Sequence, residues 1–173
     1  SSDLWKLTDG TLTQEFNGHT GAVKSVAFSF DNKTVYSASE DSTLRVWNIS
    51  DGSLLKTIRV QNDGIKSMAL SKDGKVIAIG GMHGSLKIFD VSSFEVIQTI
   101  SDNKSAISYL VFSPGGSLFV GANDGEISVW EGSSSKFNVS NRWKLHQGNV
   151  NSIAISSDGK FCITGGDDSA IKI

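Results

Sequence analysis

The sequence predicts an all-β protein built from repeats, each a four-stranded antiparallel meander. Three observations support this fold class. Short apolar runs rich in β-branched residues follow one another about every ten residues, which is too close for helices. Turn sequences separate these runs. An aromatic residue also recurs at intervals of 42, 42 and 41 residues, at Trp5, Trp47, Phe89 and Trp130.

The turn sequences mark the strand boundaries most clearly in each repeat. A four-residue turn sequence follows an apolar run ending in serine, and it reads FDNK, KDGK, PGGS and SDGK in successive repeats. Asp-Gly between two alternating runs is a strong hairpin signal. The chain has 18 glycines and one proline, which fits many turns that need positive φ rather than a proline-rich disordered tract.

The elements follow in a fixed order along the chain. The second full repeat shows four strands, IKSMALS, KVIAIGG, SLKIFDV and VIQTI. The first two runs carry small residues among branched ones, so we expect both of their faces to be buried, whereas the later runs should meet water. The predicted ranges are 1–17 (the end of a third strand and a fourth strand), 18–60, 61–102, 103–145 and 146–173 (the first three strands of a further repeat).

Polar residues recur in these strands at fixed spacing. In the first full repeat His19 precedes Asp41 by 22 residues, and Ser37 and Trp47 flank that aspartate. In the last repeat the same spacing falls on His146, Thr164 and Asp168, and it predicts a tryptophan at position 174.

With these residues the chain resembles the WD-repeat β-propeller family, in which each repeat is a blade. The resemblance rests on Gly18-His19, on Trp47-Asn48 in place of Trp-Asp, and on the repeat length, and it covers essentially the whole chain. It implies a hydrogen-bonded network within a blade, which we assign to His19, Ser37, Asp41 and Trp47, and to His146, Thr164 and Asp168. The chemistry agrees, because a buried indole N–H needs an acceptor and a hydroxyl both accepts and donates.

A Ser-His-Asp catalytic triad uses the same residue types. A nucleophile has to be exposed in a cleft, whereas Ser37 lies in the middle of an apolar run. The constellation also recurs with the repeat period, which favours a structural role over a single active site.

The two middle repeats depart from the pattern. The second has Gln61, Ile79, His83 and Phe89 at the corresponding positions, and the third keeps Asp124 and Trp130 with Asn103 near the histidine position. We assign neither repeat a network. His83 is interpreted as a turn residue rather than a metal ligand, since no second His or Cys stands at ligand spacing. Cys162 aligns with Val35, which favours a buried, inert thiol.

The resemblance implies a non-catalytic scaffold that binds other proteins or peptides on one propeller face within a multiprotein complex. The residues on that face come from the loop entering the first strand and from the turn before the network aspartate. They are Lys24, Glu40, Lys66, Met82, Ser108, Asn123, Asn151 and Asp167. The alternative interpretation is that they are solvated loop residues.

Composition limits the other function classes. Lys and Arg number 16 against 18 Asp and Glu, and both signs are scattered, so a basic face for nucleic acid or anionic membranes is not expected. No apolar run approaches the ~20 residues that span a bilayer. No cofactor, metal or catalytic motif is found, so we expect no enzyme and no cofactor. The alternative is an enzyme or nucleic-acid-binding subunit whose functional groups lie on blades outside this chain. The single cysteine favours the cytoplasm or nucleus.

Both ends of the sequence cover third-strand positions. We therefore expect part of a longer propeller, completed by the remaining blades of a longer chain. A second copy that pairs to give eight blades is the next hypothesis, and closure as a four-bladed ring is a third. Trp143 aligns with Phe16, so we expect it to pack between strands, and its exposure would instead suggest a lateral contact.

Overall fold

The computed structural model describes residues 2–60, 64–133 and 136–173, and every regular element among them is a β-strand. All the strand pairs given are antiparallel, and within each sheet consecutive strands pair with each other. The predicted fold class, all-β with four-stranded antiparallel meanders, is confirmed. The chain divides into two compact units, Ser1–Ile65 and Lys66–Ile173, and each is described by itself.

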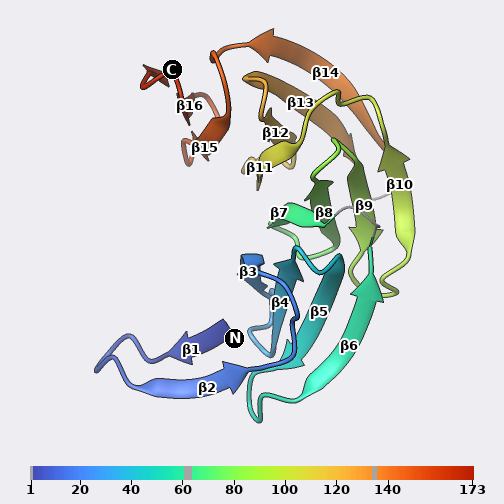
Figure 1. Cartoon of the computed structure of the whole chain (residues 1–173), viewed down its shortest axis with the longest axis vertical. Coiled ribbons are helices and arrows are strands. Elements are labelled where there is room, and N and C mark those ends of the chain that lie inside the picture. The colour runs from blue at the N-terminus through green and yellow to red at the C-terminus, as the bar shows by residue number, and fades with distance from the viewer. Residues whose placement is uncertain (1, 61–63, 134–135) are drawn as a thin grey trace. The chain divides into compact units, whose positions relative to one another are not determined.

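The first unit contains a two-stranded and a four-stranded sheet (Figure 1). In the four-stranded sheet the register joins Val35 to Trp47 and Ser37 to Arg45, which places the second and third strands side by side over most of their length. The strands are β1 (Ser2–Trp5), β2 (Leu12–Phe16), β3 (Val23–Phe28), β4 (Thr34–Ser39), β5 (Thr43–Asn48) and β6 (Leu54–Arg59).

The second unit contains two four-stranded sheets and one three-stranded sheet. Consecutive sheets touch through their inner strands, β8 against β11 and β12 against β15. The strands are β7 (Ile65–Leu70, beginning at the division), β8 (Val76–Gly81), β9 (Leu86–Asp90), β10 (Val96–Ile100), β11 (Ile107–Phe112), β12 (Leu118–Ala122), β13 (Glu126–Ser133), β14 (Lys136–Lys144), β15 (Val150–Ile155), β16 (Cys162–Gly166) and β17 (Ile171–Lys172).

These strands fall within the predicted repeat ranges, although the range 61–102 begins at Gln61, which lies outside the described residues. The β3–β6, β7–β10 and β11–β14 sheets each supply four strands, and the β15–β17 sheet supplies three. No helix among the described residues is long and apolar enough to span a membrane.

The turn between the first and second strands closes by the same local hydrogen bonds in three of the blades, and in the β11–β14 blade Ser113 accepts the Ser117 N–H without an aspartate. In the first, the Ser29 hydroxyl donates to Asp31 Oδ1 at 2.6 Å and accepts the Thr34 N–H at 3.0 Å. The third residue of the turn sequence has positive φ, with Asn32 at 56° and its glycine counterparts Gly74, Gly116 and Gly159 at 71°, 90° and 72°. Glycine and asparagine take this conformation at low cost, which explains the recurrent turn sequences.

Burial follows the expected gradient in the β7–β10 sheet, but β3, β15 and β16 each have exposed residues where both faces were expected to be buried. β4 and β8 are almost fully buried, and β6 is largely exposed. The expectation that first strands are buried on both faces is wrong for β3, where Val26 and Phe28 are 58% and 51% exposed. The preceding sheet, β1–β2, has two strands and no inner strand to cover this face of β3.

Candidate functional site

Four side chains in the β3–β6 blade form a continuous hydrogen-bonded chain. The Trp47 indole N–H donates to Ser37 Oγ at 2.7 Å, and Ser37 Oγ lies 2.7 Å from His19 Nε2. His19 Nδ1 lies 2.8 Å from Asp41 Oδ2. Every group has a partner when the His19 proton sits on Nδ1, so that Ser37 donates to Nε2 and the imidazole donates to the carboxylate.

Strand geometry explains why these residues meet. Ser37 lies in the middle of β4, two residues after Val35, so these two side chains share one face of the strand. The cross-strand partner of Val35 is Trp47 on β5, which brings Trp47 to the same face as Ser37. Trp47 is 1% exposed and packs against Phe16 of β2, with ring centroids 5.8 Å apart. The network therefore joins the loop that enters the blade to its third strand and to the preceding sheet.

The Asp41 carboxylate is the most heavily bonded group in this network. Burial raises its pKa, but the Thr43 hydroxyl, the His19 ring and the backbone N–H groups of Thr20 and Thr43 donate to it and outweigh that effect. The Thr43 hydroxyl lies 2.6 Å from Oδ1. The pKa of Asp41 is consequently held well below its usual value, so this side chain is a fixed negative charge near neutral pH.

The last blade carries the same network without an indole. His146 Nδ1 lies 2.8 Å from Asp168 Oδ1, and His146 Nε2 lies 2.8 Å from Thr164 Oγ1. The hydrogen bond from His146 lowers the pKa of Asp168 to about 2, assisted by the Gln147 and Ala170 N–H groups and opposed by burial. No indole N–H among the described residues reaches Thr164.

The middle blades are held differently. Phe89, at the tryptophan position of β9, is 1% exposed. Trp130 of β13 donates its indole N–H to Ser128 Oγ, two residues earlier on the same strand, at 2.9 Å. Asn103 donates from Nδ2 to the Gly84 carbonyl at 3.1 Å, and His83 lies in the β8–β9 turn.

The burial of the networks bears on their chemistry. Ser37 is fully buried and Thr164 is 2% exposed, so neither hydroxyl is open to a substrate. A nucleophile needs a cleft in which the reacting carbon can approach it. The arrangement is suited to holding strands together.

Among the described residues no cluster of three or more His, Cys, Asp or Glu is placed to hold a metal ion. Burial raises the pKa of the half-buried Cys162 thiol, which disfavours the thiolate.

The residues predicted for the partner-binding face lie at one end of each sheet. In β3, β11 and β15 the strand register shifts by one residue, and the residue left without a cross-strand partner is Lys24, Ser108 or Asn151. Each shift lies beside the turn before the network aspartate position, which holds Glu40, Asn123 or Asp167. A β-bulge of this kind bends the strand and re-aims the side chain.

These side chains have different partners. Lys24 and Glu40 form an ion pair at 2.9 Å, and both are partly exposed. Asn151 Nδ2 donates to Asp167 Oδ1 at 2.7 Å. Ser108 uses its hydroxyl inside the second unit, where Oγ donates to the Val150 carbonyl at 2.6 Å.

Three further candidates are half-buried: Lys66, Met82 and Asn123. Asn123 Oδ1 is fully buried and accepts no hydrogen bond from the described residues. Partner binding by any of these eight positions stays a prediction.

Several participants were missed by sequence reasoning. Thr43 lies two residues after Asp41, and an aspartate followed two residues later by a hydroxyl residue could have indicated it. Ser128 could have been found from strand alternation, which places residues i and i+2 on one face. The bulges at Lys24, Ser108 and Asn151 have no evident signal in the residues themselves.

Comparisons with known proteins match this geometry. A family model described as "WD domain, G-beta repeat" matches residues 10–48 and 137–173, and one described as "Anaphase-promoting complex subunit 4 WD40 domain" matches residues 59–115. A comparison with curated proteins gives no match.

Solved structures show the same fold. The crystal structure of the computationally designed Ika8 protein is similar with a TM-score of 0.82 at 23% identity. The match covers 98% of this chain and 50% of the designed chain, so this chain spans half the length of that protein. In total 1328 solved chains match, so the fold is common and does not by itself identify a function.

Proposed function

Because the chain belongs to the WD-repeat β-propeller family, whose repeats generally mediate protein–protein interactions, we propose that it binds a partner protein or peptide on the bulged end of its sheets. This end is formed by the first-strand bulges and by the turns between second and third strands. It presents lysine, aspartate, glutamate and amide side chains. A polar surface that carries both positive and negative charges suits a partner that also carries charges of both signs.

The recurrent bulge is the observation that carries this proposal. A bulge leaves one residue out of the strand ladder and turns its side chain toward the end of the sheet, and bulges are enriched beside binding sites. It occurs at the same place in β3, β11 and β15. Its recurrence supports a role in presenting side chains at this end, as it does for Lys24 and Asn151.

The proposed module acts without catalysis, as a subunit of a larger assembly. The match to a subunit domain of a complex supports this setting. We propose the cytoplasm or nucleus as its location, which the single cysteine supports.

Selection from a random peptide display library on the immobilised chain tests the proposal. The face variant is Lys24→Glu/Glu40→Lys/Lys66→Glu, which keeps the Lys24–Glu40 ion pair by exchanging its ends while reversing the presented charges. We expect the selected peptides to bind this variant with a Kd at least about tenfold higher, or about 1.4 kcal/mol weaker.

The matched control is Lys72→Glu, which changes the net charge by the same amount. Lys72 is exposed in the turn at the other end of the β7–β8 pair. We expect it to bind the same peptides as the unchanged chain does. Peptides that bind all three proteins equally would show that the bulged ends are ordinary solvated loops.

A further inference from the structure

A pocket of about 320 Å³ lies in the second unit, beside the β7–β8 turn and the β11–β12 turn. Its apolar lining includes Phe112 and Phe137, whose ring centroids lie 6.1 Å apart. The Gln98 side chain fixes the position of Phe137, because Nε2 donates to the Phe137 carbonyl at 2.9 Å and Oε1 accepts the Phe137 N–H at 2.7 Å. Pockets of this size, with apolar walls and a few polar groups, are suited to small molecules.

The β11–β12 turn, which forms one side of this pocket, lacks the aspartate that the other three turns have. In the β7–β8 turn, Asp73 Oδ1 accepts the Ser71 hydroxyl at 2.6 Å and the Lys75 N–H at 3.1 Å. Gly115 stands at the aspartate position of the β11–β12 turn, two residues after Ser113. Apart from its chain neighbours, a Cβ atom built on Gly115 would have only Ser113 Oγ nearby among the described residues, at 3.9 Å. The space that a carboxylate fills in the other turns is therefore open here.

This open space adjoins a buried hydroxyl whose proton is unused. Ser113 is 6% exposed, and its Oγ accepts the Ser117 N–H at 3.0 Å. A serine hydroxyl can donate as well as accept, but the Ser113 O–H has no acceptor among the described residues. The Gly115 N–H also has no acceptor in the described parts of the chain. Because a buried donor without an acceptor is costly, Ser113 favours a group that supplies one.

The charges around the pocket favour an anion. Lys72 and Asp73 are the charged residues that line it. The Asp73 carboxylate is already bonded within its own turn, and Lys75 Nζ lies 3.9 Å from Asp73 Oδ2. The two lysines thus outweigh the aspartate at this rim. A carboxylate that entered the pocket would form charge-assisted hydrogen bonds, which are stronger than those to a neutral acceptor.

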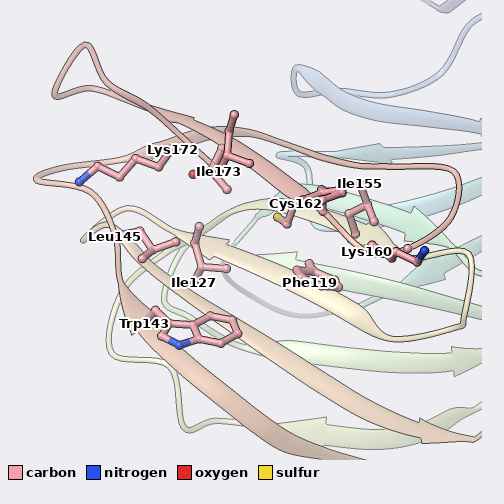
Figure 2. A pocket seen from close by; sticks show the side chains of 12 residues that line it. Phe119, Ile127, Trp143, Leu145, Ile155, Lys160, Cys162, Lys172 and Ile173 are labelled. Atoms are coloured by element: carbon pink, nitrogen blue, oxygen red, sulfur yellow. The ribbon is translucent and has the colours of Figure 1, made fainter.

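A larger groove of about 410 Å³ in the same unit does not offer such a hydroxyl. Figure 2 shows its lining, to which Phe119, Ile127 and Trp143 contribute apolar surface. The hydroxyl that lines it belongs to Thr164, and its Oγ1 already lies at hydrogen-bond distance, 2.8 Å, from His146 Nε2. Ser113, by contrast, has a proton to donate to a ligand.

We propose that the smaller pocket binds a small organic acid, whose carboxylate takes the place of the missing aspartate. The carboxylate accepts the Ser113 O–H and the Gly115 N–H, and the apolar body of the acid contacts Phe112 and Phe137. The volume of about 320 Å³ suits a free acid of low molecular weight. The site lies at the opposite end of the sheets from the bulged end, so it is independent of the function proposed above.

The probe is 4-fluorobenzoate, and its fluorine NMR signal is followed while the 173-residue chain is added. We expect a saturable shift with a Kd of about 1 mM or lower. Gly115→Asp restores an internal carboxylate to the turn and should raise that Kd at least about tenfold. Ser113→Ala removes the buried donor and should raise it as well. Gly115→Asp keeps the Ser113–Ser117 bond, so it stays informative if Ser113→Ala disturbs the turn.

Ser157→Asp is the matched control, because Ser157 is exposed in the corresponding turn of the β15–β17 blade and the change adds the same charge. It should bind the probe as the unchanged chain does. Circular dichroism of each variant checks that the strands remain. The neutral analogue 4-fluorobenzamide has the same ring without the charge, so it should bind the unchanged chain at least about tenfold more weakly.

Three results would overturn the proposal. The first is the absence of a saturable shift with 4-fluorobenzoate. The second is a Kd that Gly115→Asp leaves unchanged, because the probe would then bind elsewhere. The third is equal affinity for the amide, since apolar contact alone would then account for the binding.

Discussion

The β3–β6 and β15–β17 blades carry the same network with different completeness. Both hold the histidine against the aspartate at 2.8 Å and against a hydroxyl at 2.7 or 2.8 Å. The first blade adds Trp47 and the Thr43 hydroxyl, whereas the last has Ala170 at the threonine position and no described indole at the hydroxyl. The histidine, hydroxyl and aspartate thus take their geometry from the loop that enters the blade, the second strand and the turn that follows, and the indole adds the third strand.

The largest expected effect is at Trp47 in the first blade. Its side chain is 1% exposed, so Trp47→Ala leaves a cavity, and we expect the free energy of unfolding to fall by about 3–5 kcal/mol. Trp5→Ala, at the corresponding repeat position, should cost less than about 0.5 kcal/mol in dilute, monomeric protein. Urea denaturation followed by circular dichroism measures both. Similar losses for the two variants would mean that Trp5 is buried in the monomer.

The hydroxyl groups give the next largest difference. Ser37→Ala leaves both the Trp47 N–H and His19 Nε2 without their partner, whereas Thr164→Val affects His146 alone. Since a buried unpaired group costs about 1–3 kcal/mol, we expect roughly twice the loss of stability for Ser37→Ala. Urea midpoints in dilute protein provide the test. Equal losses would show that the indole bond adds nothing to the first blade.

The β11–β14 blade extends the comparison, because its Trp130 donates the indole N–H to Ser128 on the same strand. Ser128→Ala should cost about 1 kcal/mol, measured by the same denaturation, and should leave the tryptophan buried. Quenching of fluorescence by acrylamide reports that burial. A rise in quenching would show that Ser128 positions the ring and does more than satisfy its N–H.

The smallest expected effect is the pH dependence. The folded pKa of Asp168 is about 2, below its usual value of 3.8, and that of Asp41 is lowered further. The folded state therefore binds fewer protons than the unfolded state in this range, so this stabilisation is complete above about pH 4 and declines as the pH falls toward 2. Asp41→Asn and Asp168→Asn should differ less from the unchanged chain at pH 3 than at pH 6. A constant difference in urea midpoint would rule out this linkage.

Sequence spacing was sufficient for features that depend on local order. The turn at Ser29–Thr34 and the strand order follow from residue types within a few positions, and the structure brings together the side chains that the 22-residue spacing selects. Features that depend on what covers a strand could not be predicted. Phe28 has the residue type of a core position and is exposed because inner strands are missing beside it. Trp143 of β14 is 44% exposed, although Phe16, at the corresponding repeat position, is buried.

The bulges could not be predicted for a different reason. Lys24, Ser108 and Asn151 share no side-chain chemistry, yet all three stand out of register. The register shift is set by how the first strand meets the second beside the turn. The residue type at the bulge is consequently free to vary, which makes this position suited to changing specificity.

The self-contained turn between the first and second strands has a consequence for how the repeats diverged. In three blades its serine and aspartate bond to each other at 2.6 Å, and in the remaining one Ser113 still accepts the Ser117 N–H at 3.0 Å. Such a turn needs no residue from another blade. A duplicated repeat can thus lose its histidine, aspartate and tryptophan, as the β7–β10 blade illustrates, and keep its first hairpin. Natural selection can then alter one copy while its neighbours preserve the fold.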